Sequence, residues 1–136
     1  MNNIKILTFV GASGSGKSTV VKELFLLHPD WSYLPSLTTR EKRESDVEGE
    51  HTYEIAREEL ERQMERGELL WLVEAHDNLF SVSKEDANQA AKESGMKLSI
   101  LKPECISILQ EYLPENVVSF YILAPEEEIL RKRLEE

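Results

Sequence analysis

Residues 4–19 read IKILTFVGASGSGKST, a short apolar run that leads directly into glycines. The apolar and β-branched residues 4–10 predict a buried β-strand. The next nine residues fit the pattern G-x-x-x-x-G-K-S/T between a strand and a helix, which is typical of a phosphate-binding loop, or P-loop. Glycines in such a loop let backbone N–H groups turn toward phosphate oxygens, at the positive end of the following helix.

The loop predicts binding of a purine nucleoside triphosphate, ATP, together with Mg²⁺. Lys17 is expected to reach the outer phosphates, and the Ser18 hydroxyl is the candidate metal ligand. The candidate ATP-binding residues are Gly11, Ala12, Ser13, Gly14, Ser15, Gly16, Lys17, Ser18 and Thr19.

The composition limits the partners of this chain. It has 136 residues, 16 Lys and Arg against 26 Asp and Glu, and a formal net charge of -10. This length predicts one domain, and the acidic balance argues against nucleic-acid polymers and anionic membranes as partners. The single cysteine, Cys105, cannot form an internal disulfide, and no targeting segment is evident, so we expect a cytoplasmic protein, monomeric or homodimeric. Basic side chains outnumber acidic ones within residues 1–43, where an anionic ligand is therefore expected.

Strand and helix signals alternate along the chain. Further strands are predicted at residues 69–73, 97–101 and 117–123. Helices are predicted to end before Pro29, to cover residues 57–66, to run from Ser83 to Gly95, to begin at Pro103, and to begin again at Pro125. The alternation predicts an α/β fold with a mostly parallel sheet and helices on both faces.

The residues after the P-loop make the prediction more specific. Residues 35–40 read PSLTTR, Arg43 follows, and residues 46–49 read DVEG. Together with the P-loop they resemble the guanylate kinase family, which has S-x-T-T-R-x-x-R and an acidic-V-x-G stretch at this distance. The likeness continues through EEL (58–60), GELL (67–70), HDNLF (76–80), YILAP (121–125) and RKRL (131–134).

This resemblance implies a P-loop NTPase-type sheet with a small acceptor-binding subdomain at about residues 35–82, within one domain of residues 1–136. It implies a nucleoside monophosphate kinase that uses ATP and Mg²⁺, with GMP and ATP giving GDP and ADP as the leading reaction. Planar guanidinium groups also suit a phosphate acceptor, because they bind its oxygens in pairs, and the three-residue spacing of Arg40 and Arg43 predicts that both converge on one phosphate. The implied catalytic residues are Lys17, Arg40, Arg43 and Arg133. The implied acceptor-binding residues are Ser36, Arg40, Arg43, Thr52, Tyr53, Trp71 and Phe80.

Two departures from the family leave the acceptor open. Trp71 stands where the family has its guanine-reading glutamate, and an indole cannot accept hydrogen bonds from guanine. Trp71 either occupies or stacks on the base position, or a one-residue register change places it in the core. Thr52 stands at a family tyrosine, and Tyr53 would serve only if the strand shifted by one residue. Another phosphorylated acceptor, such as ribose bisphosphate, is therefore an alternative substrate.

Other departures concern the metal and the lid. The family's D-x-D is replaced by Leu101-Lys102-Pro103, with Glu104 as the nearest carboxylate, and the sequence ends before the family's lid and C-terminal helix, which we expect to be absent. The second alternative is therefore a catalytically weak nucleotide-binding or protein-interaction module. Glu50 and His51 are interpreted as surface residues rather than as a metal pair, and Cys105 as an inert packing residue.

Overall fold

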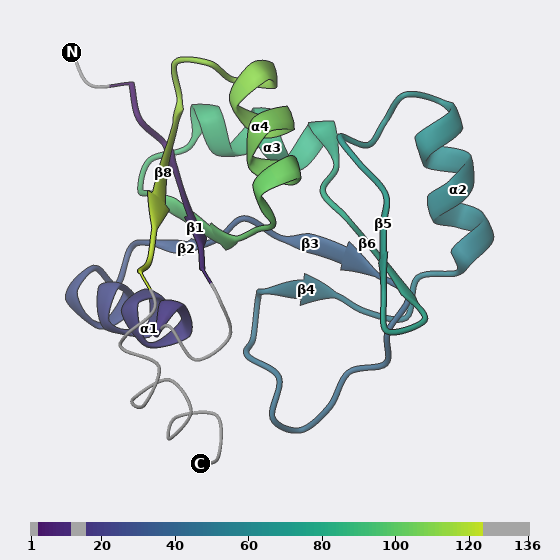
Figure 1. The fold of residues 1–136 in the computed structure, drawn as a ribbon, viewed down its shortest axis with the longest axis horizontal. Helices are drawn as coiled ribbons and strands as arrows, with labels where there is room; N and C mark the ends of the chain where they lie inside the picture. Colours follow the sequence, from purple (N-terminus) through teal and green to yellow (C-terminus); the bar gives the residue numbers. More distant parts are fainter. Residues whose placement is uncertain (1–2, 12–15, 124–136) are drawn as a thin grey trace. The chain divides into compact units, whose positions relative to one another are not determined.

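The computed structural model describes residues 3–11 and 16–123 (Figure 1). The chain divides into two compact units, a first unit of Met1–Ser32 and Gly95–Glu136 and a second unit of Tyr33–Ser94. In chain order the elements are β1 (Ile6–Val10), α1 (Lys17–Leu27), β2 (Ser32–Tyr33), β3 (Ser36–Thr38), β4 (His51–Thr52), α2 (Arg57–Glu65), β5 (Val73–Ala75), β6 (Asn78–Ser81), α3 (Lys84–Lys92), β7 (Lys97–Ile100), α4 (Pro103–Tyr112) and β8 (Val117–Tyr121).

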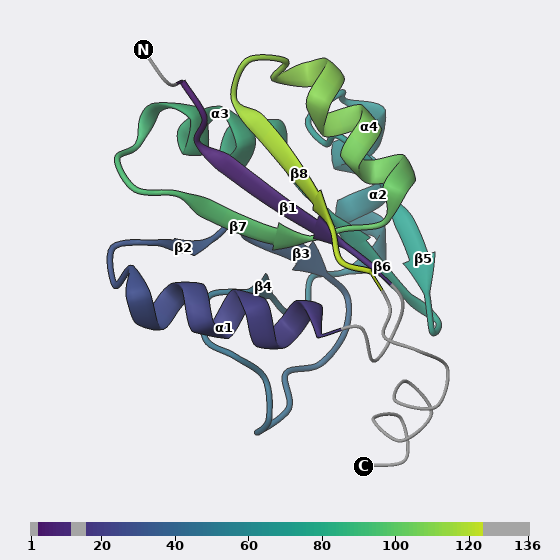
Figure 2. The same cartoon turned by 60° about the vertical axis from the view of Figure 1, so that its left-hand side comes forward.

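The first unit is built on a sheet with the strand order β2-β7-β1-β8. β1 runs parallel to both β7 and β8, with Ile6 beside Lys97 on one side and Val117 on the other. α1 packs against β7 and α4 against β8, so helices flank the sheet (Figure 2). The predicted α/β fold with a mostly parallel sheet is confirmed, because parallel neighbours require the crossover helices that the sequence contains.

Polar side chains inside the first unit have partners. Thr8 on β1 is fully buried, and its hydroxyl donates to the Ser119 hydroxyl on β8 at 2.6 Å. Gln110 on α4 donates to the same Ser119 oxygen at 3.0 Å. A buried hydroxyl is costly without such bonds, so this chain of contacts ties β1, β8 and α4 together.

The second unit contains a mixed sheet with the order β4-β3-β6-β5. β3 is parallel to β4 and antiparallel to β6, and β5 and β6 form an antiparallel pair. One face of this sheet packs on α2 through an apolar cluster. Its buried members are Leu60, Leu69 and Leu79, with Leu37, Ile55 and Leu72 packed around them.

The predicted strand at residues 69–73 is wrong in its extent. β5 begins only at Val73, and before it Leu69 forms an isolated bridge with Ser83. Val73 pairs with Phe80, so four residue steps from Leu69 to Val73 face only three steps from Phe80 to Ser83. The extra residue is a β-bulge, which interrupts the ladder and breaks the alternation of side chains around Trp71.

Other local predictions are confirmed. The Ser83 hydroxyl accepts a hydrogen bond from the Asp86 N–H at 3.0 Å and caps α3, as the spacing of these two residues predicts. Pro103 begins α4, where a missing N–H costs nothing. The helix predicted from Pro125 lies outside the described residues. Within the described ranges, none of the helices is both long and apolar enough to cross a membrane.

Gly95→Ala is expected to lower the free energy of unfolding by about 3 kcal/mol, measured by urea denaturation. Gly95 has φ +82°, and a Cβ built there would lie 2.6 Å from the Asp30 carbonyl oxygen. Both the left-handed backbone and the steric clash oppose a side chain.

Gly49→Ala is the matched control, because Gly49 has φ +87° but no atom within 4 Å of an added Cβ. Only the backbone cost remains there, about 1 kcal/mol. Equal losses in the two variants would contradict the steric argument at Gly95.

Candidate functional site

The described parts of the P-loop hold Lys17 at the start of α1. Gly16 precedes the helix with φ 99°, a left-handed conformation that favours glycine. The Lys17 ammonium donates to the Gly11 carbonyl at 2.8 Å, across residues 12–15, which lie outside the described part. The side chain therefore lies against its own loop, where outer phosphates are expected.

The beginning of α1 suits an anion. Its first turn contains no acidic residue, and the capping residue Gly16 has no side chain with which to accept a hydrogen bond from the helix. The positive end of the helix dipole is thus not offset by a carboxylate within that turn. Ser18 and Thr19 in this turn are exposed, so their hydroxyls are accessible to a ligand.

The described residues offer few ligands for Mg²⁺. Within residues 3–11 and 16–123, no three His, Cys, Asp or Glu side chains gather closely enough to hold a metal ion. The family's D-x-D position is occupied by the start of α4, where Lys102 caps the helix and Glu104 lies in its first turn. The exposed Ser18 hydroxyl fits Mg²⁺ that arrives with ATP, because Mg²⁺ keeps several waters and takes most other ligands from phosphates.

In the second unit, Arg40 and Arg43 converge on the carboxylate of Asp46. Arg40 Nη2 donates to Oδ1 at 2.8 Å and Nη1 to Oδ2 at 3.2 Å, a bidentate pair. The backbone N–H of Arg43 donates to the same Oδ2 at 2.6 Å. The Arg43 side chain is exposed. The loop between β3 and β4 thus already holds an anion between the two predicted phosphate ligands.

These hydrogen bonds, first that of Arg40 and then that of the Arg43 N–H, lower the pKa of Asp46 to about 2. The pKa of Asp46 in the folded protein lies below that of an ordinary aspartate. Any contribution of the pair to stability is therefore fully present at pH values above the ordinary aspartate pKa. It is lost only as the pH falls toward 2. At neutral pH both partners are charged.

Polar and aromatic side chains share one face of the second-unit sheet. Leu37 packs in the apolar cluster, so Ser36 and Thr38, its neighbours on β3, point to the opposite face. His51 pairs with Ser36, and Phe80 pairs with Thr38, which places these two rings on the same face. Phe80 therefore lies beside Thr38 of β3 on this face, where its ring has no hydroxyl group of the kind that a tyrosine would offer.

Tyr53, rather than Thr52, lies beside Arg40. The Arg40 guanidinium is 5.1 Å from the centroid of the Tyr53 ring, within the range of a cation–π contact. Thr52 pairs with Leu37 on the other face and is exposed. The two residues alternate across the strand end, so Tyr53 reaches Arg40 while Thr52 does not.

We define the Arg40 cluster as Arg40, Asp46, His51 and Tyr53. The rings of His51 and Tyr53 meet edge to face, with 5.5 Å between their centroids. His51 Nδ1 and the Tyr53 hydroxyl are buried and have no hydrogen-bond partner among the described residues. A buried polar group without a hydrogen bond lowers the free energy of unfolding by about 1–3 kcal/mol. In folded proteins such a group commonly marks a place where water or a ligand binds.

Glu50 and His51, interpreted as surface residues rather than as a metal pair, are only partly exposed. Their side chains are only 32% and 19% exposed, because His51 lies inward on β4 and contacts Tyr53 and Phe80. Burial first, and the nearby Asp46 next, raise the pKa of Glu50. Burial first, and Arg40 next, lower the pKa of His51, although Asp46 opposes this.

The hydroxyl groups near the expected base position are already engaged. Ser36 donates to the Ser81 carbonyl at 3.2 Å, and Thr38 donates to the Leu79 carbonyl at 2.8 Å. Ser81 in turn donates to the carbonyl of Trp71. A donating hydroxyl keeps free lone pairs, so Ser36 still has acceptor capacity for a ligand.

The side chain of Trp71 is buried, with 6% of the residue exposed. Leu72, rather than Trp71, packs against the apolar cluster of α2. This burial fits the alternative in which a one-residue register change places Trp71 in the core, because the bulge adds one residue before Val73.

The family model for guanylate kinase matches residues 3–136. This chain belongs to the guanylate kinase family. It is 32% identical to the guanylate kinase of Helicobacter pylori over 133 residues, an overlap of 98% of this chain and 64% of that relative. It is 36% identical to the guanylate kinase of Trichormus variabilis over 133 residues, covering 96% of this chain and 65% of the relative. The chain thus spans a little under two thirds of these curated relatives.

A solved structure supports the fold. The crystal structure of guanylate kinase from Anaplasma phagocytophilum matches with a TM-score of 0.69 and 24% sequence identity, covering 98% of this chain and 67% of that chain. At this identity the likeness shows the fold of the guanylate kinase family and nothing further.

The sequence prediction for this guanylate kinase family member found most of the residues that the second unit groups together. The contribution of Asp46 as the anion between Arg40 and Arg43 was missed, and so was the inward position of His51. A signal for Asp46 existed, because the acidic-V-x-G stretch lies six residues after Arg40. Arg133 lies outside the described residues.

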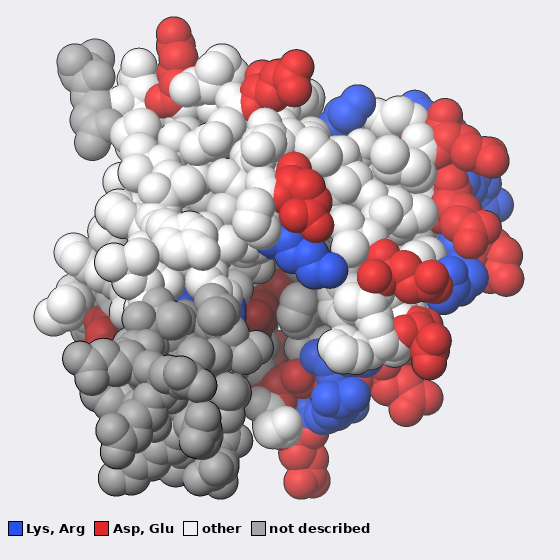
Figure 3. Space-filling view, viewed as in Figure 1, with Lys and Arg blue, Asp and Glu red and all other residues white. Residues whose placement is uncertain are grey.

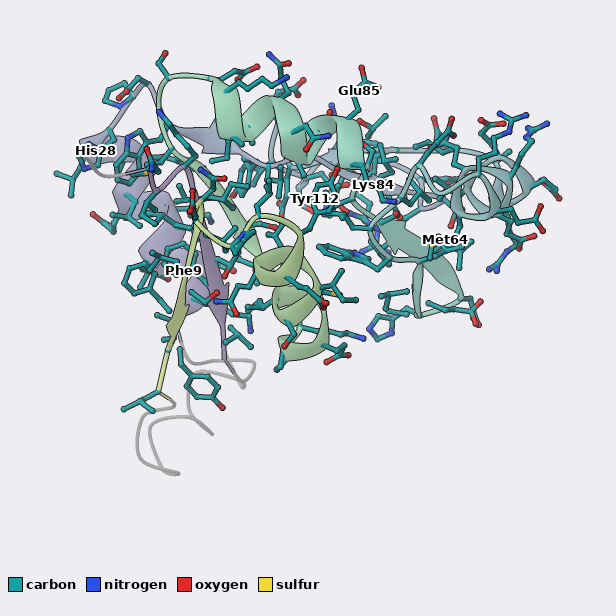
Figure 4. All side chains as sticks on the ribbon, turned by 90° about the horizontal axis from the view of Figure 1, so that it is seen from above. Phe9, His28, Met64, Lys84, Glu85 and Tyr112 are labelled. Carbon is teal, nitrogen blue, oxygen red and sulfur yellow. The ribbon has the colours of Figure 1, made fainter. Side chains whose placement is uncertain are left out.

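Two further features, Cys105 and a groove between α2 and α3, do not suit the binding of phosphate. Cys105 is buried in α4, and burial raises the pKa of its thiol to about 11, so it stays protonated and inert, as predicted. A groove of about 690 Å³ lies between α2 and α3. Lys84 and Glu85 stand at its α3 side (Figure 4), and acidic and basic groups intermix over α2 (Figure 3). Such mixed charge gives a dianion no net attraction.

Proposed function

We propose that this protein transfers the γ-phosphoryl group of ATP to a nucleoside monophosphate, with GMP, the acceptor that the family name implies, as the leading substrate. The observation that carries the proposal is the anion-holding geometry of Arg40, which already grips a carboxylate in bidentate fashion. Membership of the guanylate kinase family and the P-loop lysine supply the donor side. The second unit, including residues 35–82, is the proposed acceptor-binding part.

In the proposed reaction, charge neutralisation and positioning supply the rate enhancement, and no covalent intermediate is needed. Lys17 binds the outer phosphates at the positive end of α1, and Gly11–Thr19 wrap the triphosphate. Mg²⁺, held with the Ser18 hydroxyl, offsets charge on the phosphates when it is bound. Arg40 and Arg43 hold the acceptor phosphate, and Arg133 is the proposed additional cation.

The proposed acceptor residues follow from the polar face of the second-unit sheet. Arg40 and Tyr53 contact each other, and Ser36 and Phe80 share the face on which His51 lies. Thr52 is a weaker candidate, because it is exposed on the opposite face. The cytoplasm is the proposed compartment, and a monomer or homodimer is the proposed state, on the strength of the acidic composition and the single cysteine.

A second candidate function is the phosphorylation of an acceptor without guanine, such as a ribose bisphosphate. Trp71 favours it, because a buried indole offers no acceptor for guanine N1–H at the position of the family's glutamate. The phosphate grip of Arg40 would serve either acceptor, since it recognises the phosphate and not the base.

An assay of ADP release with ATP-Mg²⁺ and a panel of acceptors separates these functions. Acceptor-dependent ADP with GMP is the expected result, and a faster reaction with ribose bisphosphate than with GMP would establish the second candidate. ADP release that no acceptor stimulates would contradict both and leave a nucleotide-binding or protein-interaction module.

A further inference from the structure

His51 lies beside the group that holds the anion. It pairs with Ser36 in the sheet, and its ring contacts Tyr53 at 5.5 Å and Phe80 at 5.9 Å between centroids. Tyr53 in turn lies under the Arg40 guanidinium. The imidazole is therefore fixed between two aromatic rings, one of which carries the phosphate-binding arginine on its face.

Hydrogen-bond accounting leaves two atoms of the Arg40 cluster unused. His51 Nε2 is 3.7 Å from Glu50 Oε1, whereas Nδ1 is buried without a partner among the described residues. The Tyr53 hydroxyl also has no partner at hydrogen-bond geometry among the described residues. Burial first, and Asp46 next, raise its pKa, whereas Arg40 opposes the rise through its charge and a side-chain interaction with the hydroxyl. Both atoms can donate, Nδ1 when it carries the ring proton.

The anion already present does not use these two atoms. Asp46 accepts three hydrogen bonds, one on Oδ1 and two on Oδ2, and all three come from Arg40 and the Arg43 N–H. A phosphate monoester presents three strong acceptor oxygens and up to two negative charges. It can therefore replace Asp46 on Arg40 and still accept further hydrogen bonds.

We propose that His51 is a ligand of the acceptor phosphate, donating from Nδ1 beside the Tyr53 hydroxyl when the phosphate replaces Asp46 on Arg40. This inference rests on the proposed role of Arg40 in acceptor binding. The neutral ring with its proton on Nδ1 can already donate, and the charge of the bound phosphate in addition favours the protonated ring, so we expect acceptor binding to increase protonation of His51.

The sign follows from the groups that face the imidazole, which are Arg40, Asp46, Glu50 and Tyr53. Burial first and Arg40 next lower the pKa of His51 in the free protein, so the ring is neutral at pH 7. A bound dianion raises that pKa, because it favours the charged ring. Affinity is thus highest at pH values below the pKa of His51 in the free protein, and the gain is lost as the pH rises through the higher pKa of the bound state.

Two substitutions separate hydrogen bonding from titration. His51→Phe keeps a ring against Tyr53 and Phe80 but removes the donor, and we expect inorganic phosphate and GMP to bind about tenfold more weakly. His51→Asn keeps a donor near the place of Nδ1 but cannot titrate, so it should bind more tightly than His51→Phe. Calorimetry from pH 6 to 8.5 should show a flatter dependence in both variants than in the wild type. The ratio to the wild type at each pH cancels the titration of the phosphate itself.

His76→Asn is the matched control, because His76 is exposed in the same unit and asparagine tolerates its positive φ of 51°. It should leave both the affinity and its pH dependence unchanged. ATP affinity and circular dichroism verify that the His51 variants are folded.

Nuclear magnetic resonance of the wild-type ring gives an independent readout that needs no variant. The pKa of His51 should rise on addition of inorganic phosphate. An unmoved pKa, or wild-type phosphate affinity in His51→Phe, would overturn the inference even if GMP is phosphorylated. Conversely, His51-dependent phosphate binding without acceptor-stimulated ADP release would uphold it while the proposed kinase function failed.

Discussion

Lys17→Ala is expected to weaken the binding of ATP-Mg²⁺ by at least about 100-fold. The lysine ammonium lies within its loop, 2.8 Å from the Gly11 carbonyl, at a helix start whose first turn has no acidic residue. Its removal takes from the P-loop the lysine charge next to the triphosphate and leaves the loop only its backbone N–H groups and the helix dipole, beside the proposed Mg²⁺ and Arg133. Titration of a fluorescent ATP analogue measures the loss.

Lys22→Ala is the control for this experiment. Lys22 is exposed on the same helix, so its removal changes the net charge equally without touching the loop. Its ATP affinity should equal that of the wild type. Equal weakening in the two variants would attribute the effect to bulk charge, and retained affinity in Lys17→Ala would refute the assignment of the loop.

The first unit could be predicted well from the sequence because its signals are local. The apolar run before Gly11 predicts β1 correctly. A local signal also works in the second unit, where the spacing of Ser83 and Asp86 predicts the cap of α3. Each such signal depends on residues only a few positions apart. Tertiary context did not need to override them.

The region around Trp71 could not be predicted, because its conformation depends on residues distant in the chain. Leu69, Leu70 and Trp71 are all buried, and a continuous apolar run resembles a strand whether or not it is paired. The bulge exists because Leu69 meets Ser83 while Val73 meets Phe80. Only the completed ladder shows that one residue is extra.

The hairpin between β5 and β6 was missed for a related reason. His76 and Asp77 both have positive φ, 51° and 66°, as a two-residue hairpin turn of type I′ requires. The usual signals for this turn are Asn-Gly, Asp-Gly and Gly-Gly, and His-Asp lacks the glycine of all three. The turn nevertheless sets the register that places Phe80 beside Thr38 on the face of the Arg40 cluster.

The candidate acceptor site was predicted by residue type but not by geometry. The three-residue spacing of Arg40 and Arg43 suggested that two guanidinium groups converge on one phosphate. In the folded loop the Arg40 guanidinium and the Arg43 backbone N–H converge on Asp46. Irregular loops follow no period, so their side-chain directions cannot be read from spacing.

Arg40→Ala is expected to raise the KM for the acceptor by about 100-fold while it leaves the KM for ATP nearly unchanged. The substitution removes a guanidinium that is only 15% exposed and bonds an anion at 2.8 Å and 3.2 Å. It also leaves Asp46 without its largest stabilising partner, so a carboxylate that remains ionised at pH 7 would repel the incoming phosphate. Steady-state kinetics with each substrate varied in turn measure the two KM values.

Arg40→Lys and Lys42→Ala complete this experiment. The lysine at position 40 keeps the charge but not the planar pair of donors, so its acceptor KM should lie between those of the wild type and Arg40→Ala. Lys42 is an exposed neighbour that pairs with Glu48 at 3.2 Å, and its loss should not alter either KM, because exposed pairs contribute little. If Lys42→Ala raised the acceptor KM as much as Arg40→Ala, the loop would act as a diffuse positive field. The bidentate grip of Arg40 would then not be the reason for acceptor binding.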